Sequence, residues 1–247
     1  DPWAYNQGYL WTTYPPSFDL ASSTGDVIVN TTWRGNILIN GVVTVNSGVT
    51  LNIDPGTVIK FQTTGSGLTV EGTLNSNGST SSPVYFTSYK DDSVGGDTNS
   101  NGTSTAPAAS DWKEIKINSG GNATFNHSVV RYGSNSTESS NIFNNGGILN
   151  FNNSTSTLGV YYSIRGSAGT TTINSSYVGD SFYGVGMRGS ATTTITNSKL
   201  SDNDIYGIDA GNYPYYTSLT LTNNKFDNNS SGTGYFDISN GLVLTNS

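Results

Sequence analysis

The chain has no cysteine and little charge. None of its 247 residues is cysteine, and only 11% are charged. The absence of cysteine excludes disulfides, catalytic thiols and thiolate metal sites together. Ten Lys and Arg stand against seventeen Asp and Glu, which gives a formal net charge of −7. Because nucleic-acid binding rewards clustered positive charge, we expect no nucleic-acid partner.

Long apolar runs are also missing. No stretch approaches the roughly 18 apolar residues of a membrane-spanning helix, so we expect no membrane span. Helix formers are scarce, whereas the chain has 30 glycines and abundant Asn, Ser and Thr. These residues suit tight turns between short strands. The first residues do not resemble a signal peptide, and we expect that a secreted form would already have lost its signal.

The sequence does contain a repeat. Short segments with an apolar lead residue followed by Asn, Ser or Thr recur with spacings of 26, 22, 22, 26 and 23 residues. The lead residues are Phe125, Phe151, Ile173, Ile195, Leu221 and Leu244. A period in the low twenties, built from short β-branched runs, is typical of stacked coils that share one core. We predict an all-β fold, a right-handed parallel β-helix (solenoid) of roughly ten coils.

The chain divides into two parts on this interpretation. Residues 1–30 are aromatic and aperiodic, and we interpret them as an N-terminal cap that covers the open end of the solenoid. An exposed aromatic platform for sugars is the alternative for the same segment. Residues 31–247 form the β-helix, and a polar Asp/Asn/Gly-rich insertion interrupts it at 89–110.

Several strings give the chain a family resemblance. They are NSGVTLNIDPGTVIKF (46–61), LTVEGTLNSNGSTSSPVYFTS (68–88), KDDSVGGDTNSNG (90–102), DWKEI (111–115) and VVRYGS (129–134). They resemble bacterial right-handed parallel β-helix repeat proteins of the pectate-lyase-like superfold. The resemblance implies a secreted or cell-surface, extracellular bacterial protein. It implies no particular activity, because this superfold carries lyases, hydrolases, adhesins and stalks alike.

The insertion contains a candidate calcium site. Residues 97–102 read DxNxNG, and the oxygens of Asp97, Asn99 and Asn101 stand at alternate positions before a glycine turn. Hard cations such as Ca²⁺ prefer this kind of oxygen set. An EF-hand is excluded because its twelfth position would be Ala108. The missing charge would come from Asp91, Asp92 or Asp111. The alternative is a solvated loop without an ion.

Two polar columns cross neighbouring coils. The only histidine, His127, aligns with Asn153, Ser175, Asn197, Asn223 and Asn246. We interpret this column as a hydrogen-bonded corner ladder and not as a catalytic site. Asp180, Asp202 and Asn228 form a second column at a turn. Stacking would hold the two carboxylates at a separation that a retaining glycosidase uses, but any ladder position does the same.

Aromatic and charged residues form further columns. Tyr162, Tyr183, Tyr206 and Phe236 align, either as a sugar-binding surface or as ordinary ring stacking within the solenoid. Aligning Ile164, Met187, Ile208 and Ile238 predicts an exposed ion pair between Arg188 and Asp209. An insertion places Tyr213, Tyr215 and Tyr216 beside Pro214. Because loops that project from a solenoid often form its binding face, these three tyrosines are our ligand-binding candidates.

Three functions remain open. The first is a non-catalytic extracellular β-helix that acts as an adhesin, a stalk or a polysaccharide-binding surface module. The second is a polysaccharide lyase or glycoside hydrolase, although the sequence shows no clustered carboxylates with supporting basic residues. The third is a self-assembling filament or surface-lattice subunit. The apolar segment 242–247 favours an end covered by further coils or by another copy stacked end to end. The expected partners are a polysaccharide, a cell-surface glycan or other copies of the chain.

Overall fold

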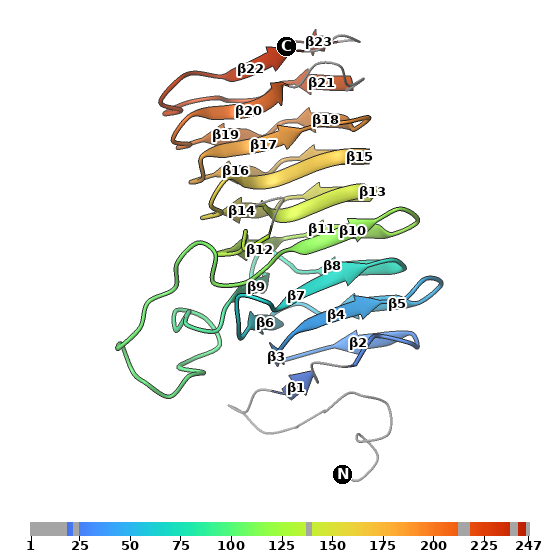
Figure 1. The fold of residues 1–247 in the computed structure, drawn as a ribbon, viewed down its shortest axis with the longest axis vertical. Helices are drawn as coiled ribbons and strands as arrows, with labels where there is room; N and C mark the ends of the chain where they lie inside the picture. The colour runs from blue at the N-terminus through green and yellow to red at the C-terminus, as the bar shows by residue number, and fades with distance from the viewer. Residues whose placement is uncertain (1–18, 22–24, 137–139, 212–217, 238–241, 246–247) are drawn as a thin grey trace.

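The computed structural model describes residues 19–21, 25–136, 140–211, 218–237 and 242–245. Within these ranges there is no helix, and parallel strands stack into a β-solenoid of about nine turns (Figure 1). This is close to the roughly ten coils that the repeat predicts. Most of the predicted N-terminal cap lies outside the described residues, so the cap stays a prediction.

The strands form two sheets. Sheet A contains β1 (Asp19–Ala21), β3 (Asn36–Ile39), β6 (Val58–Phe61), β9 (Val84–Ser88), β12 (Ser128–Arg131), β14 (Thr155–Thr157), β16 (Tyr177–Gly179) and β19 (Lys199–Ser201). Sheet B contains β2 (Thr31–Trp33), β4 (Val42–Val45), β5 (Thr50–Ile53), β7 (Gly67–Val70), β8 (Thr73–Asn77), β10 (Ile115–Asn118), β11 (Asn122–Asn126), β13 (Ser140–Asn152), β15 (Tyr162–Asn174), β17 (Tyr183–Met187), β18 (Thr192–Thr196), β20 (Tyr206–Gly211), β21 (Ser218–Thr222), β22 (Gly234–Asp237) and β23 (Leu242–Thr245).

A typical coil runs through one strand of sheet A and then two segments of sheet B. The two B segments are separate strands in most coils and fuse into one long strand in β13 and β15. We call the turn from sheet A into sheet B the A-to-B corner, and the turn from sheet B back into sheet A the B-to-A corner. These two corners carry the polar and aromatic columns.

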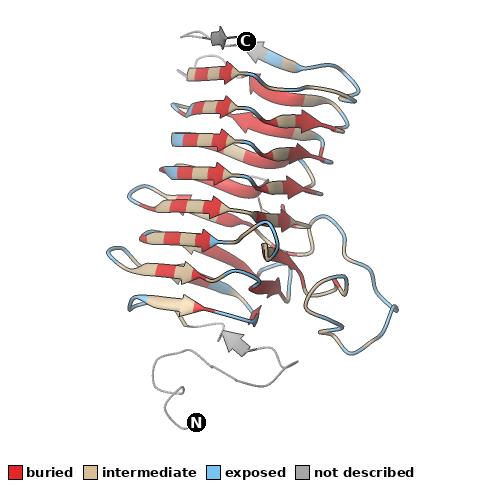
Figure 2. Ribbon diagram, turned by 180° about the vertical axis from the view of Figure 1, so that it is seen from behind, coloured by how far each residue is buried: buried red, intermediate tan, exposed pale blue. Residues whose placement is uncertain are grey.

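The strand register confirms the repeat. Phe125 pairs with Phe151, and the pairing continues through Ile173, Ile195, Leu221 and Leu244. The first five of these side chains are buried. Figure 2 shows buried positions alternating with less buried ones along the strands. No single coil can bury its apolar residues, so each depends on its neighbours for a core.

The B-to-A corner is held by a serine ladder. Ser128, Ser154 and Ser176 each donate a backbone N–H to the Oγ of the serine one coil further on, at 3.0 to 3.1 Å. The preceding residue in each coil has a positive φ, from 45° at His127 to 52° at Asn197 and Asn223. An Asn–Asn bond also forms there, from Asn223 Nδ2 to Asn197 Oδ1 at 2.8 Å. His127 therefore occupies a corner position of the ladder, as predicted.

Candidate functional site

The insertion leaves the solenoid at the A-to-B corner. It lies between β9 and β10, and Figure 1 shows it as a green loop projecting from one side of the stack. The other described coils make this turn with shorter connections. We call residues 89–110 the excursion. Its contacts with the solenoid include residues of β3, β6, β9, β12 and the segment that returns to β10.

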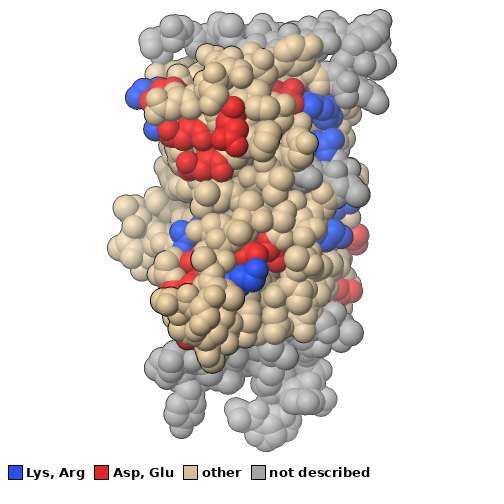
Figure 3. Space-filling model, turned by 60° about the vertical axis from the view of Figure 1, so that its left-hand side comes forward, with Lys and Arg blue, Asp and Glu red and all other residues tan. Residues whose placement is uncertain are grey.

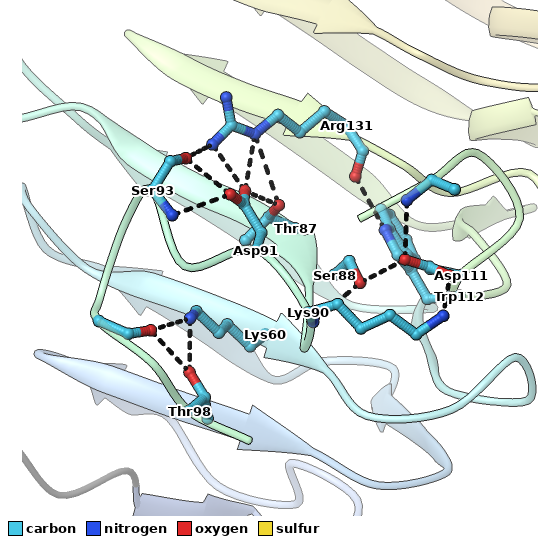
Figure 4. Close-up of polar contacts among 12 residues, drawn as sticks. Lys60, Thr87, Ser88, Lys90, Asp91, Ser93, Thr98, Asp111, Trp112 and Arg131 are labelled. Carbon is cyan, nitrogen blue, oxygen red and sulfur yellow. Dashed lines mark hydrogen bonds and ion pairs between the residues drawn. The ribbon is translucent and has the colours of Figure 1, made fainter. Parts of the chain in front are cut away.

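Trp112 anchors the return of the chain from the excursion. Its side chain is fully buried, and its ring stacks on Phe61 with centroids 4.0 Å apart and an interplanar angle of 12°. Its Nε1 donates to the backbone oxygen of Arg131 at 2.9 Å (Figure 4). A side chain at Gly133 would collide with the indole, because an added Cβ would lie 2.9 Å from Trp112 Cζ2. The tryptophan thus fixes where the solenoid resumes.

An ion pair ties the start of the excursion to β12. Arg131 donates from Nε and Nη2 to Asp91 Oδ2 at 2.9 and 2.6 Å. The hydroxyls of Thr87 and Ser93 also donate to the Asp91 carboxylate. Burial opposes ionisation of this carboxyl, but hydrogen bonds from Ser93 and Thr87, together with Arg131, hold the pKa of Asp91 below its ordinary value. Asp91 is therefore a buried, charged residue that attaches the excursion to β12.

Two lysines complete the attachment of the excursion (Figure 4). Lys90 Nζ lies 2.6 Å from Asp111 Oδ1, and Ser88 Oγ donates to the other carboxylate oxygen at 2.7 Å. Lys60 on β6 is fully buried, and its Nζ donates to the Gly96 backbone oxygen at 2.7 Å. Burial lowers the pKa of Lys60, although neighbouring carboxylates act in the opposite direction. These contacts attach the excursion to the solenoid at several points.

The predicted calcium ligands fall into two groups. Asp91 and Asp111 have their oxygens engaged by the cations and hydroxyls just described. Asp97, Asn99 and Asn101 lie together further out, because both amides donate to Thr105 Oγ1, at 3.1 and 2.9 Å. Among the described residues, no three acidic or histidine side chains group as metal ligands. Any ion in the excursion would therefore depend on amide oxygens.

Three oxygens in the excursion have no hydrogen-bond donor. The Oδ1 atoms of Asp92, Asn99 and Asn101 are shielded from solvent and accept no hydrogen bond within the described structure. Leaving a buried acceptor unsatisfied costs about 1–3 kcal/mol. All three belong to the predicted ligand set. Each of the three is an acceptor in the excursion without a donor.

The carboxylate column forms at the same corner and begins three coils further on, after β16. Asp180, Asp202 and Asn228 all have φ between 52° and 62°, and Asn228 Nδ2 donates to Asp202 Oδ1 at 2.9 Å. The Tyr177 hydroxyl lies 3.1 Å from Asp180 Oδ2 and 2.9 Å from Asp202 Oδ2. Burial, followed by the bond to Asp202, raises the pKa of Tyr177. Figure 3 shows acidic side chains gathered on the upper part of this edge.

Asp202 is not suited to be the acid of a hydrolase pair. Hydrogen bonds from Asn228 and Tyr177 lower the pKa of the Asp202 carboxyl. A glycosidase acid needs the opposite shift, because it must carry a proton at the working pH. A carboxylate that accepts from an amide and a phenol is typical of a structural ladder.

Six aromatic rings line the A-to-B corner. We call Tyr161, Tyr162, Phe182, Tyr183, Tyr206 and Tyr235 the aromatic strip. Stacked pairs with interplanar angles of 23° to 28° and centroid distances of 5.2 to 6.4 Å run along it. Tyr161, Phe182 and Tyr235 are 49%, 41% and 51% exposed. The predicted column was right for three tyrosines, and Tyr235 adds a ring that stacks on Tyr206. Phe236 pairs with Ala210 in the strand register, two residues beyond the Ile208 position of the predicted alignment.

The predicted exposed ion pair is largely buried. Arg188 Nη2 and Asp209 Oδ2 lie 2.6 Å apart, and their side chains are only 19% and 10% exposed. The Tyr162 hydroxyl donates to the same carboxylate oxygen at 2.8 Å. Burial and Asp209 raise the pKa of this tyrosine. This triad fixes the base of the aromatic strip.

The register prediction behind that pair was wrong. Ile164 pairs with Val185 and not with Met187, so Arg165 lies beside Gly186 and does not stack with Arg188. An added Cβ at Gly186 would lie 2.5 Å from Tyr162 Cδ1. The glycine therefore leaves the space that the Tyr162 ring fills.

Sequence reasoning missed the three half-exposed rings of the strip, Tyr161, Phe182 and Tyr235. Tyr161 and Phe182 each stand immediately before a predicted column residue, and these consecutive aromatic pairs were the available signal. The predicted ligand residues Tyr213, Tyr215 and Tyr216 lie outside the described residues, so that prediction stays untested. No segment of the described chain forms a helix long and apolar enough to cross a membrane.

Comparison with known proteins identifies no relative. No protein-family model, no curated protein and no solved structure matches this chain. The β-solenoid assignment therefore rests on the strand pairing of the chain itself.

Proposed function

We propose that this chain is a non-catalytic extracellular β-helix module that binds a neutral polysaccharide or cell-surface glycan along its A-to-B corner. The observation that carries the proposal is the aromatic strip. Its rings follow the solenoid axis over successive coils, and three of them are about half exposed. An exposed aromatic surface of this kind favours an interaction partner.

The strip is a rigid surface. The inner rings of Tyr183 and Tyr206 are flanked by other rings, so they offer edges and hydroxyls to a ligand. Tyr161 and Phe182 supply the larger exposed apolar areas. Aromatic side chains that are already restrained by stacking lose little conformational entropy when a ligand binds. A polymer lying along the axis would meet apolar patches and hydroxyls in sequence.

Charge at this edge favours a neutral ligand. The carboxylates of Asp180 and Asp202 lie at the same corner as the strip, and the whole chain carries a formal net charge of −7. Both features repel a uronate-rich or sulfated polymer. The resemblance to bacterial β-helix repeat proteins of the pectate-lyase-like superfold supports a bacterial cell-surface or secreted module, acting as an adhesin or a stalk. The lowered pKa of Asp202 counts against this residue as the general acid of the enzyme alternative.

A double substitution tests the binding surface. Tyr161→Ala with Phe182→Ala should lower affinity at least about tenfold for whichever of insoluble cellulose, xylan or chitin the native chain binds, because it removes two of the three half-exposed rings of the strip. Pull-down isotherms give the affinities. Ile148→Ala is the matched control, since Ile148 is 47% exposed on sheet B. Undiminished binding by the double variant, with reduced binding by the control, would place the site elsewhere.

A further inference from the structure

We propose that the excursion holds a Ca²⁺ ion, bound by side-chain oxygens of Asp92, Asp97, Asn99 and Asn101. The site is independent of the glycan-binding proposal, because it belongs to a different segment of the A-to-B corner. The sequence motif alone would not establish it. The structure adds a second observation that points to a cation.

That observation is the set of unsatisfied oxygens. Asp92, Asn99 and Asn101 each have an Oδ1 atom shielded from solvent with no hydrogen-bond donor. Three of the six such atoms in the described structure fall within the excursion, and the other three belong to Asn122, Ser140 and Asn203 in separate parts of the solenoid. A hard cation is the partner that carboxylate and amide oxygens share.

The loop already has the shape that an ion would need. Asp97 accepts backbone N–H bonds from Asn101 at 3.2 Å and from Gly102 at 2.8 Å, which curls the chain around its carboxylate. Ser100 and Gly102 have φ of 53° and 62°. A carboxylate has about four lone-pair sites, so these two bonds leave room for a metal. The amide groups of Asn99 and Asn101 face the same Thr105 hydroxyl.

The donor set indicates which ion would bind and with what affinity. Amide and carboxylate oxygens suit Ca²⁺ better than Mg²⁺, which demands near-ideal octahedral geometry. Only two carboxylates contribute, and the Lys60 ammonium lies close enough to interact with both. We therefore expect a dissociation constant on the order of 10⁻⁴ to 10⁻³ M, the range of extracellular modules.

Thermal melting of the whole chain tests the proposal. Against EDTA, 5 mM CaCl₂ should raise the melting temperature by about 3–6 °C, and 5 mM MgCl₂ by less than about 1 °C. Terbium(III) luminescence, competed by CaCl₂, reports binding directly. Asp97→Ala should abolish both responses. Equal melting curves in EDTA and CaCl₂, with no competable terbium signal, would overturn the site.

A gain-of-affinity variant tests the ligand assignment even if Asp97→Ala does not fold. Asn99→Asp adds a charge to the donor set and should tighten calcium binding about tenfold. Asn122→Asp is the matched control, because Asn122 also has an unsatisfied Oδ1 but lies on β11. It should leave the calcium affinity unchanged. An unchanged or weakened affinity in Asn99→Asp would remove Asn99 from the site.

Discussion

Replacing Trp112 with alanine will lower the free energy of unfolding by about 3–5 kcal/mol. The indole is fully buried, and the change removes both its stack on Phe61 and its hydrogen bond to the Arg131 backbone oxygen. It also leaves that backbone oxygen without this donor. The substitution should also loosen the excursion, because Trp112 lies where the excursion rejoins the solenoid.

A conservative variant separates the two contributions of Trp112. Trp112→Phe keeps an aromatic stack on Phe61 but loses the Nε1 donor, so it should lose less stability than Trp112→Ala. Denaturant unfolding followed by circular dichroism gives both values. A loss below about 1 kcal/mol for Trp112→Ala would show that the indole does not anchor the coil.

Replacing Arg131 with methionine will lower the free energy of unfolding by about 3–5 kcal/mol at pH 7. The change leaves Asp91, whose side chain is 2% exposed, without its cation. A buried carboxylate that loses its partner keeps its desolvation penalty. Adding Asp91→Leu in the same chain should recover most of the loss, because it removes the uncompensated charge. A double variant less stable than Arg131→Met would contradict this explanation.

The same pair predicts a pH dependence. The folded-state pKa of Asp91 lies below its ordinary value, so its contribution to stability is present above the unfolded pKa of about 3.9 and is lost as pH falls through the lower folded pKa. The stability difference between the native chain and Arg131→Met should therefore shrink below about pH 4. Urea titrations at pH 7, 4 and 3 measure it. A difference that stays constant down to pH 3 would assign the effect to lost packing of the Arg131 side chain.

The repeat made much of the fold predictable. Lead residues such as Phe125 and Phe151 specify inward positions, and the register pairs them as expected. The strand β8 is harder to predict, because its sequence TLNSN lacks a repeated apolar position. Its inward Ser76 is fully buried and hydrogen-bonds to Ser128 Oγ at 2.8 Å, a partner 52 residues away. A polar pair buried across coils leaves no signal in either segment alone.

The register between strands of neighbouring coils was harder to predict than the existence of the coils. Val185 and Met187 have the same parity, so both point inward, and only the pairing with Ile164 and Gly166 distinguishes them. Aligning Met187 with Ile164 therefore placed this strand two residues out of register. The attachment of the excursion was also hidden, because Asp91 and Arg131 are 40 residues apart in sequence. The motif at 97–102, in contrast, could be read directly because its residues are local.

The most direct test of the proposed function measures binding and turnover in the same samples. The native chain is incubated with insoluble cellulose, xylan and chitin, and with pectin and alginate. The retained fraction, the reducing ends and the unsaturated products are then determined. We expect retention on at least one neutral polymer, little on the two uronate polymers, and no products from any of them. Retention on no neutral polymer, or turnover that Asp180→Asn or Asp202→Asn abolishes, would contradict a non-catalytic neutral-glycan module.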